Sequence, residues 1–170
     1  FENAARELGM GGSEQPGSCK KITGLSALEN IVMVDQSPLT KTPRSTPAVY
    51  TGVFEPIRKL FAESIEGKSR EITPGYFSFN SGAGRCERCL GNGAERVEMQ
   101  FLSDLWVTCP ECEGRRYTTE ALEIQFEGKN VHEVLEMTVT TAIDFFEPLK
   151  DRKAEKIVDG LRILADVGLG

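Results

Sequence analysis

Hydrophobic and polar residues recur at helical spacing in several parts of the chain. Residues 54–64 and 151–166 each place apolar side chains three or four positions apart, along one side of a helix. A shorter helix is expected to start near Thr140 or Thr141 and to stop at Pro148, because proline cannot continue it. Asn130 precedes another apolar stretch, with Glu133 three positions on, which is the spacing of a capping box at a helix start.

Other stretches follow the pattern of strands. Residues 31–34, Ile-Val-Met-Val, form a mostly β-branched apolar run that fits a buried strand. Residues 97–108 alternate in polarity around a break at 103–104, which predicts a β-hairpin, and 122–126 predict a further strand. The intervening stretch 36–52 contains three prolines, which argue against regular helix or central strand there. The expected fold class is therefore α/β, of the mixed α+β kind.

Composition narrows the class of protein. The 170 residues are 39% hydrophobic and 27% charged, as in globular proteins, which excludes a wholly disordered chain, a collagen and a coiled coil. No run of 18 apolar residues is present, so no membrane span is expected. The chain opens without a Met or an apolar signal region, and we expect a segment of a longer, cytoplasmic protein. A net charge of −6 argues mildly against a freestanding DNA-binding domain.

The cysteines carry the strongest local signal. Four of the five form two Cys-x-x-Cys pairs separated by nineteen residues, namely Cys86, Cys89, Cys109 and Cys112. This spacing is typical of a structural Zn²⁺ site, in which four thiolates hold the ion and leave no position for a catalytic water. A redox Cys-x-x-Cys is the alternative, but two copies around a hairpin favour zinc. Gly91 and Gly114 each follow a pair by two positions, where the backbone must turn with φ > 0.

Basic and aromatic residues near these motifs have two interpretations each. Four arginines flank the cysteines and are interpreted as charge compensation rather than as DNA contacts, namely Arg85, Arg88, Arg115 and Arg116. Lys41 and Arg44 lie in a stretch without acidic residues and are better placed for phosphate contacts. Trp106 could stack on a base, but packing is favoured. Gln36 follows the predicted strand and could reach a nucleotide, although spacing alone favours a polar turn residue. The residues do not form a complete active site.

Several collinear motifs resemble the UvrA family, the damage-recognition proteins of the excinuclease in bacterial nucleotide excision repair. The resemblance covers about residues 22–170 and is carried, besides the cysteine spacing, by residues 34–38, 42–48, 50–52, 77–80, 84–86, 99–104 and 166–170. The first of these motifs reads Val-Asp-Gln-Ser-Pro and the last reads Asp-Val-Gly-Leu-Gly. The family is a tandem ABC-type ATPase that dimerises and binds DNA. The matching region belongs to its C-terminal half, between the phosphate loop and the signature motif.

The resemblance implies a role for each candidate residue. Gln36 would be the Q-loop glutamine that senses the γ-phosphate and Mg²⁺ of ATP, and Lys41 and Arg44 would face DNA. The four cysteines would hold the zinc module whose hairpin helps to discriminate damaged from undamaged duplex. The family commonly has Gly-Arg where Thr40 and Lys41 stand here, so the role of Lys41 is carried over less directly.

The resemblance also implies an organisation. Residues 1–52 would form part of the ATP-binding core with the Q-loop, and 53–150 a signature-type helical subdomain with the zinc module at 84–118. Residues 151–170 would lead back toward the ATPase signature. The parent would be an ATPase that binds damaged DNA and the UvrB component of the excinuclease and forms a homodimer, whereas this segment alone would be inactive. The alternative is the zinc region of an Hsp40-like cochaperone, which binds unfolded polypeptide and shares the Cys-x-x-Cys-x-Gly-x-Gly repeat.

Overall fold

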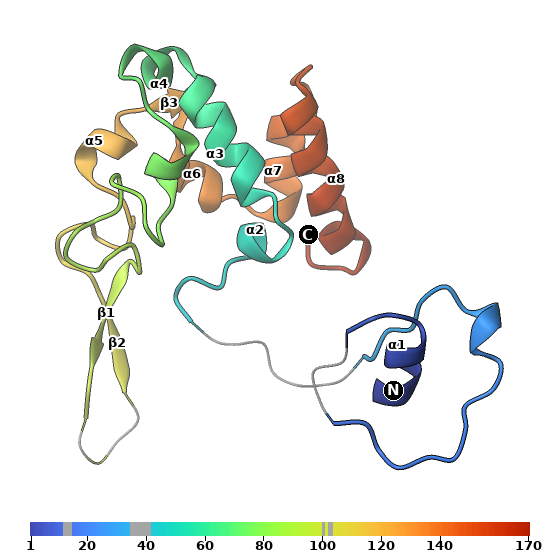
Figure 1. Ribbon diagram of the computed structural model, residues 1–170. Helices are drawn as coiled ribbons and strands as arrows, with labels where there is room; N and C mark the ends of the chain where they lie inside the picture. Colours follow the sequence, from blue (N-terminus) through green and yellow to red (C-terminus); the bar gives the residue numbers. More distant parts are fainter. Residues whose placement is uncertain (12–14, 35–41, 100, 102–103) are drawn as a thin grey trace. The chain divides into compact units, whose positions relative to one another are not determined.

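The computed structural model describes residues 1–11, 15–34, 42–99, 101 and 104–170. The chain divides into two compact units, Phe1–Leu39 and Thr40–Gly170 (Figure 1). Each unit is described by itself below. Gln36 and Lys41, two of the residues singled out in the sequence, lie outside the described residues.

The first unit contains little regular structure among its described residues. It holds the short helix α1 (Glu2–Glu7) and one turn of 3-10 helix, η1 (Leu25–Ala27). The buried strand predicted for 31–34 is wrong: these residues form no strand, and Val32 and Val34 are 76% and 90% exposed. A strand needs a hydrogen-bonded neighbour, and the described part of this unit contains no other strand to pair with.

The second unit is mainly helical, with two small antiparallel sheets. Its elements in chain order are α2 (Pro47–Tyr50), α3 (Phe54–Glu63), α4 (Ile65–Ser69), η2 (Pro74–Phe77), β1 (Ala94–Val97), β2 (Leu105–Thr108), α5 (Thr119–Leu122), β3 (Gln125–Phe126), β4 (Lys129–Asn130), α6 (Val131–Leu135), α7 (Val139–Phe146) and α8 (Arg152–Asp166). The predicted mixture of helix and strand is confirmed. In the described part of the chain, no helix is both long and apolar enough to span a bilayer.

The predicted helices are confirmed, with small shifts at their ends. Helices α3 and α8 match the predicted ranges, and α7 begins at Val139 because the Thr138 side chain accepts a hydrogen bond from the amide of Thr141. The expectation that the prolines of 36–52 exclude helix is wrong for α2. Proline is tolerated in the first helical turn, where its missing N–H has no intrahelical partner, and Pro47 occupies that position.

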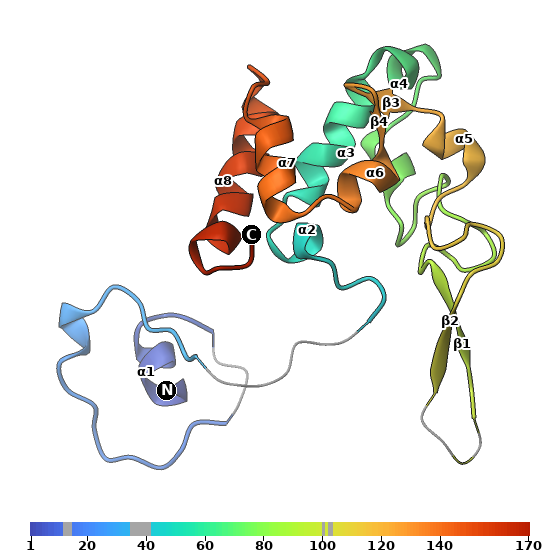
Figure 2. The ribbon, with the colours of Figure 1, turned by 180° about the vertical axis from the view of Figure 1, so that it is seen from behind.

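Helices α3, α7 and α8 pack side by side and form the body of the second unit (Figure 2). Phe61 of α3 and Ile157 of α8 are fully buried in its core, as the spacing of apolar residues predicted. Aromatic rings extend this core toward the cysteines: Phe61 lies 5.5 Å from Phe77, and Phe54 stacks on Phe79 at 4.8 Å between ring centroids. The segment that leads into the first cysteine pair is therefore anchored to the helical body.

The hairpin is confirmed, but its strands pair over a different range. Strand β1 starts at Ala94 opposite Thr108, and the pairing ends with Val97 opposite Leu105. The strands pair outward from the cysteine pairs rather than inward from the turn, because the carbonyl of Gly93 already accepts from the amide of Cys109 at 3.0 Å. We call this hairpin (94–108) the ribbon. Trp106 is 47% exposed on it, so the favoured packing covers only about half of the side chain.

The strand predicted over 122–126 is confirmed only at its end. The Thr118 side chain accepts a hydrogen bond from the amide of Ala121 and starts α5, which takes Leu122 into a helical turn. Only Gln125 and Phe126 remain for β3, which pairs with β4. A local capping residue thus overrides the alternating pattern.

Replacing Asn130 by alanine is expected to destabilise the helical body by about 1 kcal/mol. The predicted capping box is present: the Asn130 side chain accepts from the amide of Glu133 at 2.9 Å, and the Glu133 carboxylate accepts from the amide of Asn130 at 2.7 Å. Alanine leaves the Glu133 amide without its acceptor. Urea denaturation measures the change, and an Asn130→Asp variant, which keeps the acceptor, should stay within a few tenths of a kcal/mol.

Candidate metal centre

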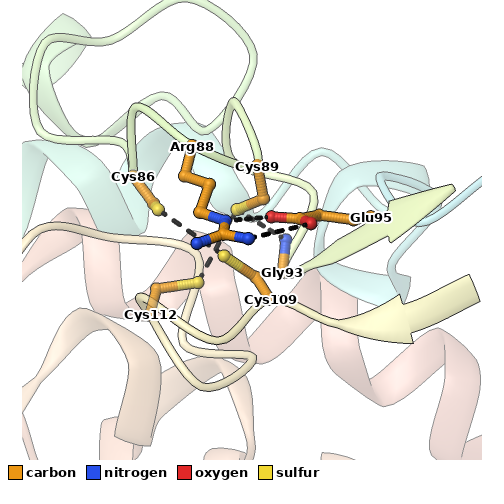
Figure 3. A network of polar contacts seen from close by, with 7 residues as sticks. All are labelled: Cys86, Arg88, Cys89, Gly93, Glu95, Cys109 and Cys112. Carbon is orange, nitrogen blue, oxygen red and sulfur yellow. Dashed lines mark hydrogen bonds and ion pairs between the residues drawn. The ribbon is translucent and has the colours of Figure 1, made fainter.

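The four predicted cysteines converge on one point in the structure. Their Sγ atoms all lie within 4.8 Å of one another, with Cys86 and Cys109 4.0 Å apart and Cys89 and Cys112 3.6 Å apart (Figure 3). A tetrahedral Zn²⁺ with bonds of about 2.3 Å separates its sulfurs by about 3.8 Å. All four residues are buried. The geometry, burial and donor type therefore fit one tetrahedral metal ion held by thiolates.

Each cysteine pair is followed by the same unusual backbone path. The two residues after Cys89, Leu90 and Gly91, have φ of 51° and 80°, and the two after Cys112, Glu113 and Gly114, have φ of 51° and 86°. The fourth residue after each pair also has nearly the same φ in both segments, 72° at Gly93 and 70° at Arg116. The two segments are therefore copies of one loop, here called the first knuckle (86–93) and the second knuckle (109–116).

The knuckles point amide N–H groups at the sulfurs in matching ways. Cys86 accepts from the amides of Arg88 and Cys89, and Cys109 accepts from the amides of Glu111 and Cys112. The second cysteine of each pair accepts from the amide four residues on: Gly93 donates to Cys89 at 3.2 Å, and Arg116 donates to Cys112. These donors favour the thiolate form that binds a metal.

Burial acts in the opposite direction on the thiols. It raises the pKa of the Cys86 thiol, and it raises the pKa of the Cys112 thiol to about 12, well above its usual range. At Cys109 the hydrogen bonds outweigh burial and lower the pKa of the thiol. Thiolates at Cys86 and Cys112 therefore need a compensating positive charge, which a bound cation would supply. Because the thiols must lose their protons to bind, metal binding releases protons and strengthens as the pH rises.

The module also connects two parts of the second unit through matching contacts. The amide of Cys86 donates to the carbonyl of Arg116 at 2.8 Å, as the amide of Cys109 donates to that of Gly93 at 3.0 Å. Beyond the first contact lies the isolated bridge between Arg85 and Tyr117, and beyond the second lies the hairpin. One side of the pseudo-symmetric module therefore continues into the helical body and the other into the ribbon.

Tyr117 anchors the body side of the module. Its hydroxyl donates to the carbonyl of Phe77 at 2.9 Å, and burial raises the pKa of the phenol, which therefore stays neutral and keeps this bond. The side chain is only 2% exposed. The module is thus fixed to the aromatic core through η2.

The arginines around the cysteines each have a different partner. Arg88 pairs with Glu95 of β1, and this carboxylate raises the pKa of the guanidinium (Figure 3). Arg115 donates to the carbonyl of Cys112 at 3.2 Å and pairs with Glu113. Arg85 donates to the carbonyl of Asn80. The sequence predicted that these arginines compensate the charge of the thiolates. That role would explain why they lie near the sulfurs, but it does not explain the specific bond that each one makes.

Among the predicted DNA contacts, only Arg44 lies in the described part of the chain. Its guanidinium donates to the Asn92 side chain at 2.9 Å and to the carbonyl of Leu90 at 3.3 Å, so it lies against the first knuckle. Neither Asn92 nor the specific role of Arg116 was predicted from the sequence. Aligning the two knuckles by their cysteines would have revealed Arg116, because it stands where the other copy has Gly93.

The fold and the site define a class: a buried four-cysteine cluster, spaced to fit one metal ion, that carries a β-ribbon on a helical body. Comparison with known proteins gives the family. The chain is 51% identical over 168 residues to UvrABC system protein A of Aquifex aeolicus and 49% identical over 158 residues to that of Lactiplantibacillus plantarum, which is 98% and 93% of the chain. The chain belongs to the UvrA family, and it spans 17% and 16% of the lengths of these two relatives.

A solved structure agrees with this family. The crystal structure of UvrA2 from Deinococcus radiodurans matches with a TM-score of 0.77 and 44% identity, over 85% of this chain and 17% of that one. The family that the sequence motifs indicated is therefore confirmed, and no finding supports the Hsp40-like alternative. No family model matches the chain.

Proposed function

We propose that this chain is the part of a DNA-damage recognition protein of nucleotide excision repair that links the nucleotide site to a zinc-held ribbon. The observation that carries the proposal is a complete four-cysteine cluster at the base of a hairpin, in a chain about half identical to UvrABC system protein A. Zn²⁺ is the proposed ion, because four buried thiolates in tetrahedral spacing are its typical structural ligand set. The parent binds ATP and Mg²⁺ as an ABC-type ATPase.

The proposed organisation follows the resemblance. Residues 1–52 belong to the ATP-binding core, with Gln36 at the γ-phosphate and Mg²⁺. Residues 53–150 form the signature-type helical subdomain with the zinc module at 84–118, and 151–170 lead back to the ATPase core. The ion has a structural role, since four cysteines leave no coordination position for water or substrate.

Damaged duplex DNA is the proposed partner of the module's exposed face. The ribbon has apolar side chains that are about half exposed, including Val97 at 44% and Leu105 at 52%, and Phe101 is 94% exposed. Exposed apolar and aromatic groups can pack against unstacked bases, whereas phosphates need cations such as Lys41 and Arg44. The ribbon itself carries three acidic residues, Glu95, Glu98 and Asp104, and one basic residue, Arg96. It therefore does not provide the electrostatic attraction to DNA phosphates, and its proposed role is to contact the bases.

The remaining partners are proposed for the whole protein. In the cytoplasm, the parent forms a homodimer and hands the lesion to the UvrB component of the excinuclease. This segment by itself is proposed to bind the metal without hydrolysing ATP, because the residues that it supplies to the nucleotide site include Gln36 but no phosphate loop.

Gln36→Ala in the full-length protein is expected to uncouple ATP turnover from the preference for damaged DNA. The wild type should bind a lesion-containing duplex more tightly than the undamaged duplex, by a ratio that changes between ATP and ADP. In the variant this ratio should become the same in both nucleotides to within about twofold, because a Q-loop glutamine reports the γ-phosphate. Fluorescence anisotropy at low salt measures the affinities.

The matched control is Gln125→Ala, which removes an exposed glutamine from β3, far along the chain from Gln36. It should leave the nucleotide dependence intact. Loss of the dependence in both variants, or in neither, would contradict the proposed role of Gln36. A wild-type protein that prefers a denatured polypeptide to duplex DNA would contradict the proposed function and would favour the cochaperone alternative.

A further inference from the structure

The side chains of two arginines connect the metal module to Pro43 and Arg44. Arg116 donates to the carbonyl of Pro43 at 2.6 Å, and in the other direction Arg44 donates to the side chain of Asn92 at 2.9 Å and to the carbonyl of Leu90 at 3.3 Å. We call these contacts between Pro43–Arg44 and the module the arginine latch. Both arginines and Asn92 are half-buried, so neither guanidinium is simply solvated.

The backbone of Arg116 has a conformation that favours glycine. Its φ of 70° lies in the left-handed region, which side chains with a Cβ rarely adopt. The equivalent residue of the first knuckle, Gly93 at φ 72°, meets the same requirement without strain. An arginine is therefore not the residue that this backbone favours, and the contacts of its side chain give it a role that glycine could not have.

Three groups surround that side chain. Besides the carbonyl of Pro43, its guanidinium donates to the carbonyl of Gly91 at 3.5 Å and lies 5.5 Å from the centre of the Phe79 ring. The ring packs against the cation, and the two N–H groups of Nη1 reach the two carbonyls at once. Arg116 thereby touches the first knuckle, the aromatic core and the segment at Pro43 simultaneously.

The neighbouring arginines lack this arrangement. Arg115 makes its bonds inside its own knuckle, to Cys112 and Glu113, and Arg88 pairs with Glu95 at the start of the ribbon. Arg116 instead bonds a carbonyl 73 positions away in the sequence. A role in compensating the charge of the thiolates would not require a bond to the carbonyl of Pro43. A role in connecting Pro43 to the metal module would require it.

We propose that Arg116 and Arg44 are positioning residues that fasten Pro43–Arg44 to the metal module, so that a displacement of these two residues is passed to the ribbon. Pro43 lies seven residues after Gln36, and Asn92 lies two residues before β1. The latch therefore joins residues that follow Gln36 in the sequence to the residues that lead into β1. Its role in coupling rests on the proposed function, since it assumes that nucleotide is sensed at Gln36.

The test uses variants that leave the nucleotide and DNA residues unchanged. Arg116→Gly removes the guanidinium and suits the left-handed backbone, as Gly93 does in the other knuckle. Asn92→Ala removes the side-chain acceptor of Arg44 without altering Arg44 itself, and leaves only the longer bond to the carbonyl of Leu90. Arg115→Ala is the matched control, because it removes the same charge from the adjacent position but leaves the latch in place. All are made in the full-length protein, with zinc content measured for each.

Amide hydrogen exchange reports the latch directly. The amides of Ser45 and Thr46 donate to the carbonyls of Thr42 and Arg44, outside the metal module. In Arg116→Gly and in Asn92→Ala these amides should exchange about tenfold faster than in wild type, because each variant removes one anchor of the segment. Arg115→Ala should leave them unchanged, and all three variants should retain the metal and the basal ATP hydrolysis.

Anisotropy on the same proteins tests the coupling. The ratio of affinities for lesion-containing and undamaged duplex should lose its dependence on ATP against ADP in Arg116→Gly and keep it in Arg115→Ala. Unchanged exchange at Ser45 and Thr46 would overturn the latch. Faster exchange with the nucleotide dependence intact would overturn its role in coupling. If the wild type itself shows no such dependence, the proposed function fails, and the exchange data alone decide whether the latch exists.

Discussion

Cys109→Ser is expected to abolish metal binding and to unfold the two knuckles that hold the ribbon on the helical body. A serine hydroxyl does not supply the thiolate that Zn²⁺ requires, and Cys109 is fully buried, so no other side chain can take its place. The metal content should fall from about one ion per chain to near zero. Since a structural zinc contributes on the order of 10 kcal/mol to an independent module, the backbone amides of both knuckles should lose their protection from exchange. Elemental analysis and hydrogen exchange measure the two effects.

Cys19→Ser is the matched control for this substitution. Cys19 is the exposed fifth cysteine and lies in the first unit, where the side chain of Asn3 donates to its sulfur at 2.9 Å. The change should leave the metal content and the knuckle amides as in wild type. The helical body should survive in both variants, because its core of buried aromatic and aliphatic residues does not include the cysteine cluster. Wild-type metal content in Cys109→Ser would contradict the four-cysteine site.

Gly91→Ala is expected to destabilise the first knuckle by about 3 kcal/mol or more. The φ of 80° at this position is strained for any residue with a Cβ, and the added Cβ would overlap the main-chain carbonyl oxygen of Phe79. That oxygen belongs to a residue whose ring stacks on Phe54, so it cannot move away freely. The result should be a lower metal affinity, measured by competition with a chelator of known affinity.

Gly114→Ala separates the cost of the positive φ from the cost of the steric overlap with Phe79. Gly114 occupies the equivalent position of the second knuckle with φ of 86°, but a Cβ there would meet only the Thr108 methyl, at an ordinary 3.6 Å. It should therefore cost about 1 kcal/mol, the backbone contribution alone. Equal losses of metal affinity in the two variants would show that the contact with Phe79 has no effect.

The sequence predicted the features that depend on neighbouring residues. The knuckles are local loops, so the spacing of Cys86, Cys89, Cys109 and Cys112 was sufficient to predict that these four side chains meet. The capping box at Asn130 and Glu133 involves residues three apart and was equally visible. Helices α3 and α8 follow from their apolar faces, because one buried face determines a helix wherever the core lies.

Features that depend on distant partners were missed or wrong. Residues 31–34 have the composition of a buried strand, but a strand also needs a neighbour, which local composition does not supply. The contact of Arg44 with Asn92 joins residues 48 positions apart, and neither has a local feature that indicates the other. The first strand of the hairpin was placed too late because the alternation of apolar residues continues past Val97, whereas the knuckle determines where pairing begins.

The pseudo-symmetric module has a mechanical consequence for the ribbon. The covalent chain connects β1 and β2 to the body only through the two knuckles, so the ribbon is a lever pivoted at the cysteine cluster. The paired strands extend the lever by about 10 Å at about 3.3 Å per residue, and a tilt of about 10° at the pivot would move its far end by about 2 Å. A small adjustment among the four sulfurs is thereby amplified where the ribbon ends.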